Sequence, residues 1–339
     1  MLFSIVMLII GHLFIPFIFI IWLWRGKDKS KIDWMVKLLV VGTFVVYIFL
    51  VGRWDWLSYY LRFILIALFL IAAYKSYLRT KDLAFFSRKG LKDWVTTAIN
   101  LFVLFIFVFS NILAIKGYFY YEKPVELSFP LKNGVYYITN GGSSLIINNH
   151  NVDRSQRYAL DIVKLNIFGT RAKGIYPAEL TKYAIFGDTI YSPCDGKVIK
   201  AIDGLPDLIP PEMDVKNLAG NHVLIECKGV KILFAHMMKG SLLVKGGDFV
   251  EEGQPIGKVG NSGNTSEPHL HIHAEKGGKK GSFLDGEGVP IIFNGKFLKR
   301  NDLFIDKLMV SIIRYMLTTG QATPHFFCLA LKNLQLSLN

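Results

Sequence analysis

Long apolar runs fill the first third of the chain. Residues 2–24 contain no Lys, Arg, Asp or Glu, and at about 1.5 Å per residue a helix of this length crosses a hydrocarbon core of about 30 Å. A cleavable signal peptide would begin with basic residues and end at small ones, so we expect a retained transmembrane helix. Runs at 34–52, 57–74 and 94–115 bring the expected number of spans to four, although Arg62 interrupts the run at 57–74, the third of the four.

The basic residues between these runs predict their orientation, because short cytoplasmic loops are enriched in Lys and Arg. The loop after the first run and the loop before the fourth are strongly basic, whereas the middle loop contains only Arg53. Both basic loops should therefore be cytoplasmic. Four crossings then place everything beyond Lys116 outside the cytoplasmic membrane.

Beyond residue 118 the pattern changes to short β-type runs separated by Gly, Pro, Asn and Asp, which is typical of antiparallel β structure. Lys228-Gly229 is a two-residue link between two of these runs and predicts a tight hairpin. We expect strands at 158–163, 189–192, 196–202, 222–227, 230–236, 255–259 and 269–275. The expected fold is four N-terminal transmembrane α-helices (1–117), an antiparallel β-rich domain (118–306) and a tail (307–339) of undefined structure.

Three of the eight histidines stand in the alternating run His269-Leu270-His271-Ile272-His273. Residues two apart on a strand share a face, so the imidazoles should point one way and the apolar side chains into the core. Neighbouring imidazoles would repel each other once both were protonated, and a bound metal ion removes that conflict. His269 and His271 are therefore candidates for a metal centre, while His273, one pleat further along, fits a structural role or contact with a metal ligand better than that of a third ligand.

Two residues on other expected strands could complete such a centre. Asp161 lies among apolar residues, where a lone buried carboxylate is costly, and His236 ends an apolar run. Metal ligation would satisfy Asp161, and an ion pair with Arg157 would do so about equally well. Asp161 and His236 could face the same groove as His271.

These residues belong to a set of motifs that resembles the lysostaphin-type zinc endopeptidases. The motifs are Asp161, Leu233-Phe234-Ala235-His236-Met237, Gly260-Asn261-Ser262-Gly263-Asn264-Thr265 and Pro268-His269-Leu270-His271, together with Gly220-Asn221-His222-Val223 and the segment 188–198. They occur in the family's order across residues 135–275, which is the size of a domain. His-x-His alone would be a weak indication.

The resemblance implies a lysostaphin-like catalytic domain in which Asp161 and His271 bind Zn²⁺, while His236 and His269 are catalytic residues that act on the attacking water and the oxyanion. The family has a further histidine ligand four residues before the aspartate, and this chain has Arg157 there. Arginine stays protonated and cannot bind zinc. Either the site is degenerate or another histidine takes this role. His150, in a polar loop upstream, is the candidate, and a solvated loop histidine is the alternative interpretation.

Two functions follow from this resemblance. The first is a zinc-dependent endopeptidase that hydrolyses peptide bonds of peptidoglycan cross-bridges or stem peptides, with its catalytic domain outside the membrane. The alternative is a catalytically degenerate lysostaphin-like domain that acts as a scaffold or activator in the cell envelope. Expected partners are wall peptides and membrane lipid, with an envelope protein as a further candidate. A transporter is a poorer interpretation, since Arg62 is the only charge deep within the helices.

Charge and cysteine content narrow the picture further. The formal net charge is +13, but much of the basic excess falls in the expected cytoplasmic loops, so it does not indicate nucleic-acid binding. Cys194, Cys227 and Cys328 are odd in number and widely spaced, without a Cys-x-x-Cys pattern. We therefore expect buried free thiols rather than disulfides or a thiolate zinc site.

Overall fold

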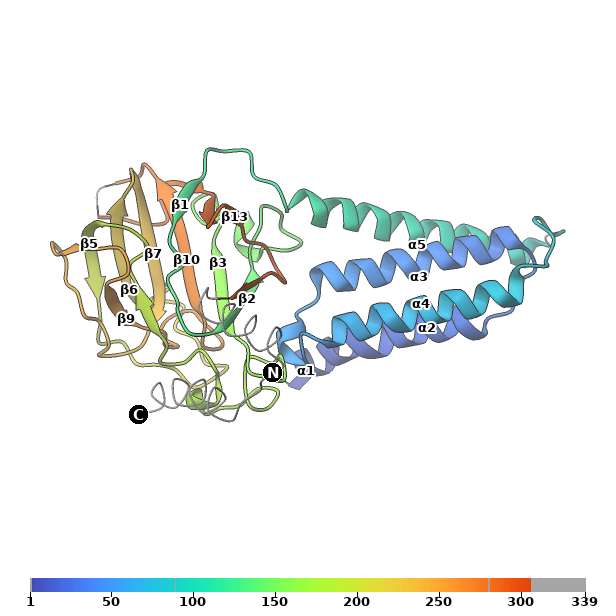
Figure 1. Cartoon of the computed structure of the whole chain (residues 1–339), viewed down its shortest axis with the longest axis horizontal. Coiled ribbons are helices and arrows are strands. Elements are labelled where there is room, and N and C mark those ends of the chain that lie inside the picture. The colour runs from blue at the N-terminus through green and yellow to red at the C-terminus, as the bar shows by residue number, and fades with distance from the viewer. Residues whose placement is uncertain (1, 89, 280, 306–339) are drawn as a thin grey trace, which may run out of the picture. The chain divides into compact units, whose positions relative to one another are not determined.

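The computed structural model describes residues 2–88, 90–279 and 281–305. It divides into two compact units, with the boundary between Tyr118 and Phe119. The first unit is helical and the second is built of β-strands (Figure 1). The tail expected at 307–339, with Cys328, lies outside the described residues.

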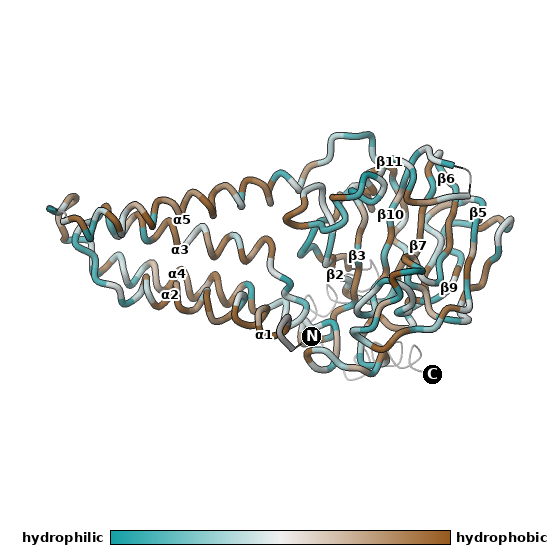
Figure 2. The backbone as a smooth tube through the Cα atoms, turned by 180° about the vertical axis from the view of Figure 1, so that it is seen from behind, coloured by the Kyte–Doolittle hydropathy of each residue, from teal (hydrophilic) through white to brown (hydrophobic). Residues whose placement is uncertain are grey.

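Within the described residues, four helices of the first unit are long and apolar enough to cross a membrane, as expected. The first is the continuous run of α1 (Leu2–Ile9), the π-helical turn η1 (Ile10–Phe14) and α2 (Ile15–Arg25). The others are α3 (Lys31–Val51), α4 (Leu61–Thr80) and α5 (Leu91–Lys116), with a short 3-10 helix, η2 (Trp54–Trp56), before α4. Apolar residues run along these helices (Figure 2).

Arg62, which interrupts the third apolar run, lies in the first turn of α4 and is buried. Its Nη2 donates to the carbonyl oxygen of Phe49 at 3.0 Å, and its guanidinium lies 3.8 Å from the centre of the Phe49 ring. A charge at a helix end with these contacts is far less costly than one at mid-span. The helix continues from there to Thr80, well beyond the expected end at residue 74.

The helices also expose large apolar side chains: Phe102 and Phe105 of α5 are each 65% exposed. Exposed apolar surface of this extent on a long helix is typical of helices that contact lipid.

The second unit is organised around one large antiparallel sheet with the strand order β14-β2-β3-β10-β7-β6-β5-β8, in which β11 also pairs with β10. A two-stranded sheet (β4-β9) and a three-stranded sheet (β1-β12-β13) complete it. Its strands are β1 (Val125–Leu127), β2 (Val135–Asn140), β3 (Leu160–Lys164), β4 (Thr189–Tyr191), β5 (Gly196–Ile202), β6 (Asn221–Cys227), β7 (Val230–Met237), β8 (Phe249–Val250), β9 (Pro255–Lys258), β10 (Leu270–Lys276), β11 (Glu287–Val289), β12 (Ile291–Phe293), β13 (Lys296–Phe297) and β14 (Leu303–Ile305). Two 3-10 helices, η3 (Asn149–Val152) and η4 (Leu180–Lys182), lie in the loops.

Alternation along the central strands separates the hydrophobic core from the functional face. Leu270 and Ile272 of β10 belong to the main core, as does Phe234 of β7, because residues two apart share a face. The intervening residues, including His271 and Asp161, therefore point to the opposite face of the sheet. One side of these strands stabilises the fold, and the other side is free for chemistry.

The expected fold class is confirmed: four long apolar helices precede an antiparallel β domain. Each of the seven expected strands is present with ends shifted by no more than two residues. Lys228-Gly229 forms the expected hairpin, with Cys227 opposite Val230 and both link residues at positive φ. The expected strand-turn-strand at 188–198 contributes to two sheets, since β4 pairs with β9 while β5 pairs with β6 and β8.

The expectation of free thiols is wrong for two of the three cysteines, because Cys194 and Cys227 form a disulfide. They are 33 residues apart in sequence, and spacing alone gave no sign of pairing. The pairing of β5 with β6 brings them together: Lys197 lies opposite Glu226, and the cysteines stand just beyond this pair.

Candidate metal centre

Three adjacent strands bring the candidate residues together. His271 on β10 lies directly opposite Asp161 on β3 and, on its other side, opposite Ala235 on β7. Side chains of directly opposed residues lie close on the same face of a sheet. The register alone therefore places Asp161 beside His271, and His236 one residue away on the third strand.

His150, Asp161 and His271 form the one group of metal-binding type found among the described residues, with ligand atoms that lie within 4.8 Å of one another. The Asp161 Oδ2 atom is 2.9 Å from His150 Nε2, and its Oδ1 atom is 2.9 Å from His271 Nδ1. The rings of His150 and His271 meet edge to face, with centroids 4.7 Å apart. One carboxylate thus links the two imidazoles.

The donor set of this group fits zinc. Two imidazole nitrogens and a carboxylate oxygen are among the ligand sets of catalytic zinc sites, which hold the ion at about 2.0–2.2 Å with a fourth position left for water. Ligand atoms around a tetrahedral ion at that distance lie about 3.4 Å apart. The spacing within the group is compatible with this after small side-chain rotations.

The loop that carries His150 is folded back over β3 by Asn148, which is fully buried. The Asn148 side chain caps η3 by accepting a hydrogen bond from the His150 backbone N–H at 3.2 Å. Its amide group donates to the carbonyl oxygens of Gly142 at 2.9 Å and Ala159 at 3.1 Å. This tie between the loop and β3 places the His150 ring against Asp161, although the two lie well apart in sequence.

Arg157, four residues before Asp161, does not contribute to this group. Its guanidinium pairs with Glu122 at 3.3 Å, and its side chain is 44% exposed. The ion pair between Asp161 and Arg157 considered from the sequence is absent from the contacts of the described residues, where the partners of Asp161 are imidazoles and Asn140.

His236 is set into the same face by a break in the alternation of β7. Ala235 and His236 both line the pocket, whereas Met237 returns to the core. The break is made by the His236 backbone, whose φ of 61° is in the left-handed region, a conformation that is uncommon outside glycine and is found at functional sites. Two successive side chains thereby reach the pocket.

In both catalytic candidates, His236 and His269, the Nδ1 atom is held by a backbone carbonyl oxygen. His236 Nδ1 lies 2.9 Å from the Ser262 carbonyl, and His269 Nδ1 lies 2.9 Å from the Glu267 carbonyl. A carbonyl only accepts, so both Nδ1 atoms must carry the proton. Each neutral ring therefore keeps its lone pair on Nε2, and His269 Nε2 lies 3.5 Å from Asp161 Oδ1.

Burial and charge set the protonation of these groups. Burial raises the pKa of Asp161, but the charges of His150 and His269 outweigh it and hold that pKa well below its usual range. Burial, with the neighbouring imidazoles, holds the pKa of His236 well below its usual range. Burial lowers the pKa of His269, and the charge and hydrogen bond of Asp161 more than offset this, so that it is raised overall. Near neutral pH the carboxylate is ionised and His236 is neutral.

Two supporting residues, Asn140 and Arg300, were not foreseen from the sequence. Asn140, the last residue of β2, donates to Asp161 Oδ2 at 2.8 Å and accepts from Arg300 at 2.6 Å. His273, expected to have a structural role, lies with Nδ1 3.0 Å from His271 Nε2. Asparagine and arginine in strand ends and loops carry no motif, so only the three-dimensional register could identify them.

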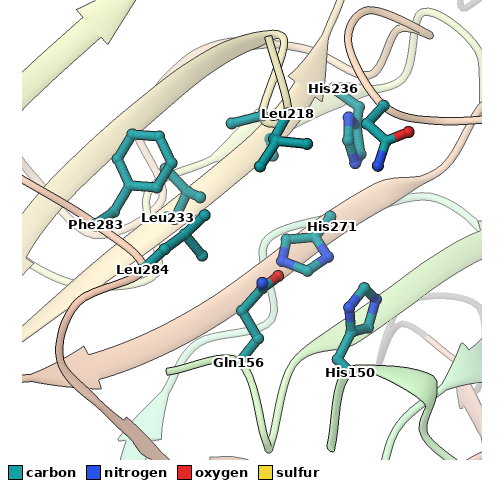
Figure 3. A pocket seen from close by; sticks show the side chains of 11 residues that line it. His150, Gln156, Leu218, Leu233, His236, His271, Phe283 and Leu284 are labelled. Atoms are coloured by element: carbon teal, nitrogen blue, oxygen red, sulfur yellow. The ribbon is translucent and has the colours of Figure 1, made fainter. Parts of the chain in front are cut away.

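The imidazoles open into a pocket (Figure 3). His150, His236 and His271 line one part of it, together with Gln156 and Asn264, whereas Leu218, Leu233, Phe283 and Leu284 form an apolar part. Figure 3 shows Phe283, Leu233 and Leu284 together on one side of His271, with His150 on the other. The His150–Asp161–His271 group is therefore accessible to a ligand that has both polar and apolar parts.

Comparison with known proteins places the sequence match on most of this site. Residues 180–282 match the family model of Peptidase family M23. That segment includes His236, His269 and His271, whereas His150 and Asp161 lie upstream of it. The match therefore covers the segment where the motifs are dense and leaves the departure at Arg157 outside.

Solved structures with similarity to the chain include a zinc-containing peptidase from Vibrio cholerae, at 25% identity and a TM-score of 0.25 over 43% of this chain and 37% of that one. Lysostaphin is similar at 18% identity and a TM-score of 0.24, over 38% of this chain and 40% of that one. The SpoIIQ–SpoIIIAH pore-forming complex is similar at 15% identity and a TM-score of 0.30, over 53% of this chain and 94% of that one.

The chain thus spans 37% and 40% of the lengths of the first two structures. The motif resemblance, which also includes Asp161 on β3, and the family match overlap on the strands from β4 to β10. Residues 180–282 are therefore the part of the chain that matches Peptidase family M23.

Proposed function

We propose that this protein is a zinc-dependent endopeptidase that hydrolyses peptide bonds of peptidoglycan cross-bridges or stem peptides. The proposal rests on one observation above all: a His150–Asp161–His271 group of zinc-binding type lies beside His236 and His269, whose Nδ1 atoms are each held by a backbone carbonyl. The match of residues 180–282 to a peptidase family supports the reaction class. His150 replaces the ligand that Arg157 cannot provide.

The residues divide into two roles. His150, Asp161 and His271 would hold the ion, and Asn140 orients the Asp161 carboxylate. A bound zinc ion supplies Lewis acidity, which lowers the pKa of water to about 7 and polarises a carbonyl. His269 Nε2, near Asp161, accepts the proton of the attacking water and passes it to the leaving amine. His236, whose Nδ1–H is held by the Ser262 carbonyl and whose Nε2 carries a lone pair, accepts a hydrogen bond that orients the attacking water.

A scaffold or activator role remains the second candidate, and the Arg157 departure favours it. A binding module, however, has no need of four imidazoles around one buried carboxylate, since burial of these polar groups costs free energy unless they are paired. Metal content separates the two candidates. A scaffold with a degenerate site would bind no zinc, and an envelope-protein partner would then be its functional ligand.

The variant His269→Ala is expected to keep its zinc and lose its activity. This residue lies outside the ligand group, and loss of a positioned acid-base catalyst typically costs about 10²–10⁴-fold in rate. The measurement compares zinc content and kcat on wall peptides for the wild-type and variant full-length proteins in detergent. Undiminished hydrolysis in the variant would contradict the assigned role, and a wild-type protein without zinc or activity would favour the scaffold.

We further propose that the four helices cross the cytoplasmic membrane and anchor the peptidase domain on its outer side. The basic loops of the helical unit support this orientation. The Cys194–Cys227 disulfide supports it independently, because disulfides persist in oxidising compartments and are rare in the cytosol.

The disulfide provides a test of this orientation. If intact cells are treated with an alkylating reagent before lysis, Cys194 and Cys227 should remain unmodified, because both thiols are already oxidised. After reduction of the same protein both should be modified, which serves as the control. Mass spectrometry of the two peptides reports the result. Full modification of both cysteines before reduction would place the domain in a reducing compartment.

A further inference from the structure

The pocket at the metal centre has an apolar part that the hydrolytic chemistry does not require. Leu218, Leu233, Phe283 and Leu284 form it, and Figure 3 shows the last three side by side next to His271. Among the described residues that line the pocket, none is Asp, Glu, Lys or Arg. This part of the pocket therefore offers an incoming ligand contact with carbon atoms rather than charge.

Phe283 and Leu284 belong to the loop between β10 and β11, and buried charges hold this loop in place. Lys231 of β7 is buried and pairs with Glu275 of β10 at 2.6 Å. Its Nζ also donates to the Ser282 carbonyl oxygen at 2.7 Å and lies 3.4 Å from Asp285 Oδ1. The cation thus ties the loop to the strands that carry His236 and His271.

Glu275, which is fully buried, holds the loop backbone directly. Its Oε2 accepts from the backbone N–H of Leu284 at 3.1 Å and of Gly286 at 3.3 Å. Leu284 has a φ of 69°, a left-handed conformation that a residue with a β-carbon adopts only when its surroundings enforce it. The Glu275 carboxylate therefore stabilises the strained backbone conformation in which the Leu284 side chain lines the pocket.

We propose that Leu218, Leu233, Phe283 and Leu284 form a specificity subsite that receives an aliphatic side chain next to the scissile bond of the peptide. This inference rests on the proposed peptidase function and narrows its substrate class. An aliphatic residue would displace water from the apolar wall. A glycine residue would leave water in contact with the apolar side chains of the subsite, and a charged side chain would lose its hydration without gaining a partner. The preferred substrate is then a peptide with an aliphatic residue at the cleavage site rather than an all-glycine bridge.

The test measures binding separately from hydrolysis. Full-length protein in detergent is stripped of metal so that it cannot cleave, and fluorescent peptides of the form Gly-Gly-Xaa-Gly-Gly are titrated, where Xaa is Gly, Ala, Leu or Asp. Because all other residues are glycine, the peptide can bind in whichever register places Xaa in the subsite. Burial of a leucine side chain favours binding by about tenfold to a hundredfold over glycine, and burial of one methyl group by about fourfold. Micelles without protein give the baseline.

Variants locate the effect. Phe283→Ala and Leu284→Ala should abolish most of the preference for Leu over Gly, whereas Phe168→Ala, an exposed phenylalanine outside the pocket, should retain it. Asp285→Asn should reduce the preference by loosening the loop without lowering the melting temperature of the sheet domain. Equal binding of the Leu and Gly peptides, or binding of none, would overturn the subsite. If the preference is found in a protein that hydrolyses no peptide, the subsite stands and the proposed peptidase function fails.

Discussion

Replacing His271 by alanine is expected to abolish both zinc binding and peptide hydrolysis. His271 lies at the centre of the site, opposite Asp161 in the strand register and 2.9 Å from its carboxylate. Loss of this imidazole leaves two ligands on a loop and a neighbouring strand, too few to retain a catalytic ion. Since a catalytic metal supplies several kcal/mol of transition-state stabilisation, hydrolysis should slow by about three to six orders of magnitude. Zinc content per chain should fall from about one to near zero.

The comparison with His269→Ala makes this result specific. Both substitutions remove an imidazole from the same face of the site, His269 directly before β10 and His271 within it, so their effects on folding should be similar. Only the His271 variant should lose metal, as measured by elemental analysis after dialysis. If both variants kept zinc, or if hydrolysis survived in the His271 variant, Asp161 and His271 would not be partners in a catalytic centre.

The variant His150→Ala is expected to show the second-largest effect. Contacts that merely support a metal ligand are worth about 10–100-fold in affinity, so removal of one of three ligands should weaken zinc binding by about a thousandfold or more. The dissociation constant can be measured by competition with a chelator of known affinity. Hydrolysis at limiting zinc should fall in parallel, and excess zinc should restore part of it.

Arg157→Ala is the matched control for this experiment, because it changes the position at which the family resemblance implies a ligand. The Arg157 side chain is paired with Glu122 and half-exposed, and a surface ion pair contributes only about 0–1 kcal/mol. Zinc affinity and activity should therefore stay close to the wild-type values. An Arg157 variant that lost zinc while the His150 variant kept it would exclude the proposed substitution of one ligand by the other.

The sequence predicted most of the fold because its strongest signals are local. Apolar run length gave the four long helices, and alternation with turn residues gave the strands from β3 to β10 except β8, including the hairpin at Lys228-Gly229. β2 was not expected: Tyr136 to Asn140 are all buried, so the strand lacks the alternation that marks a half-exposed one. The two-residue strands β8 and β13 are too short to leave a periodic pattern.

The candidate site was predictable where a motif carried it, and beyond that only in part. His236, His269 and His271 stand in dense motifs, and the structure brings them together with Asp161 and His150. The position of His150 depends on Asn148 and its hydrogen bonds across the loop, a tertiary contact that spacing does not encode. The Lys231–Glu275 pair and the Cys194–Cys227 disulfide are likewise products of strand register. Each joins residues remote in sequence that become neighbours only in the sheet.

The hydrogen bonds that Ser262 and Glu267 accept from His236 and His269 use main-chain oxygens. Exchange of either of these two residues for another amino acid would leave that oxygen in place. The backbone conformation, rather than a side chain, therefore determines which ring nitrogen of His236 and His269 carries the proton. Substitutions around the pocket can therefore change which ligand the protein recognises while His236 and His269 keep the same tautomer.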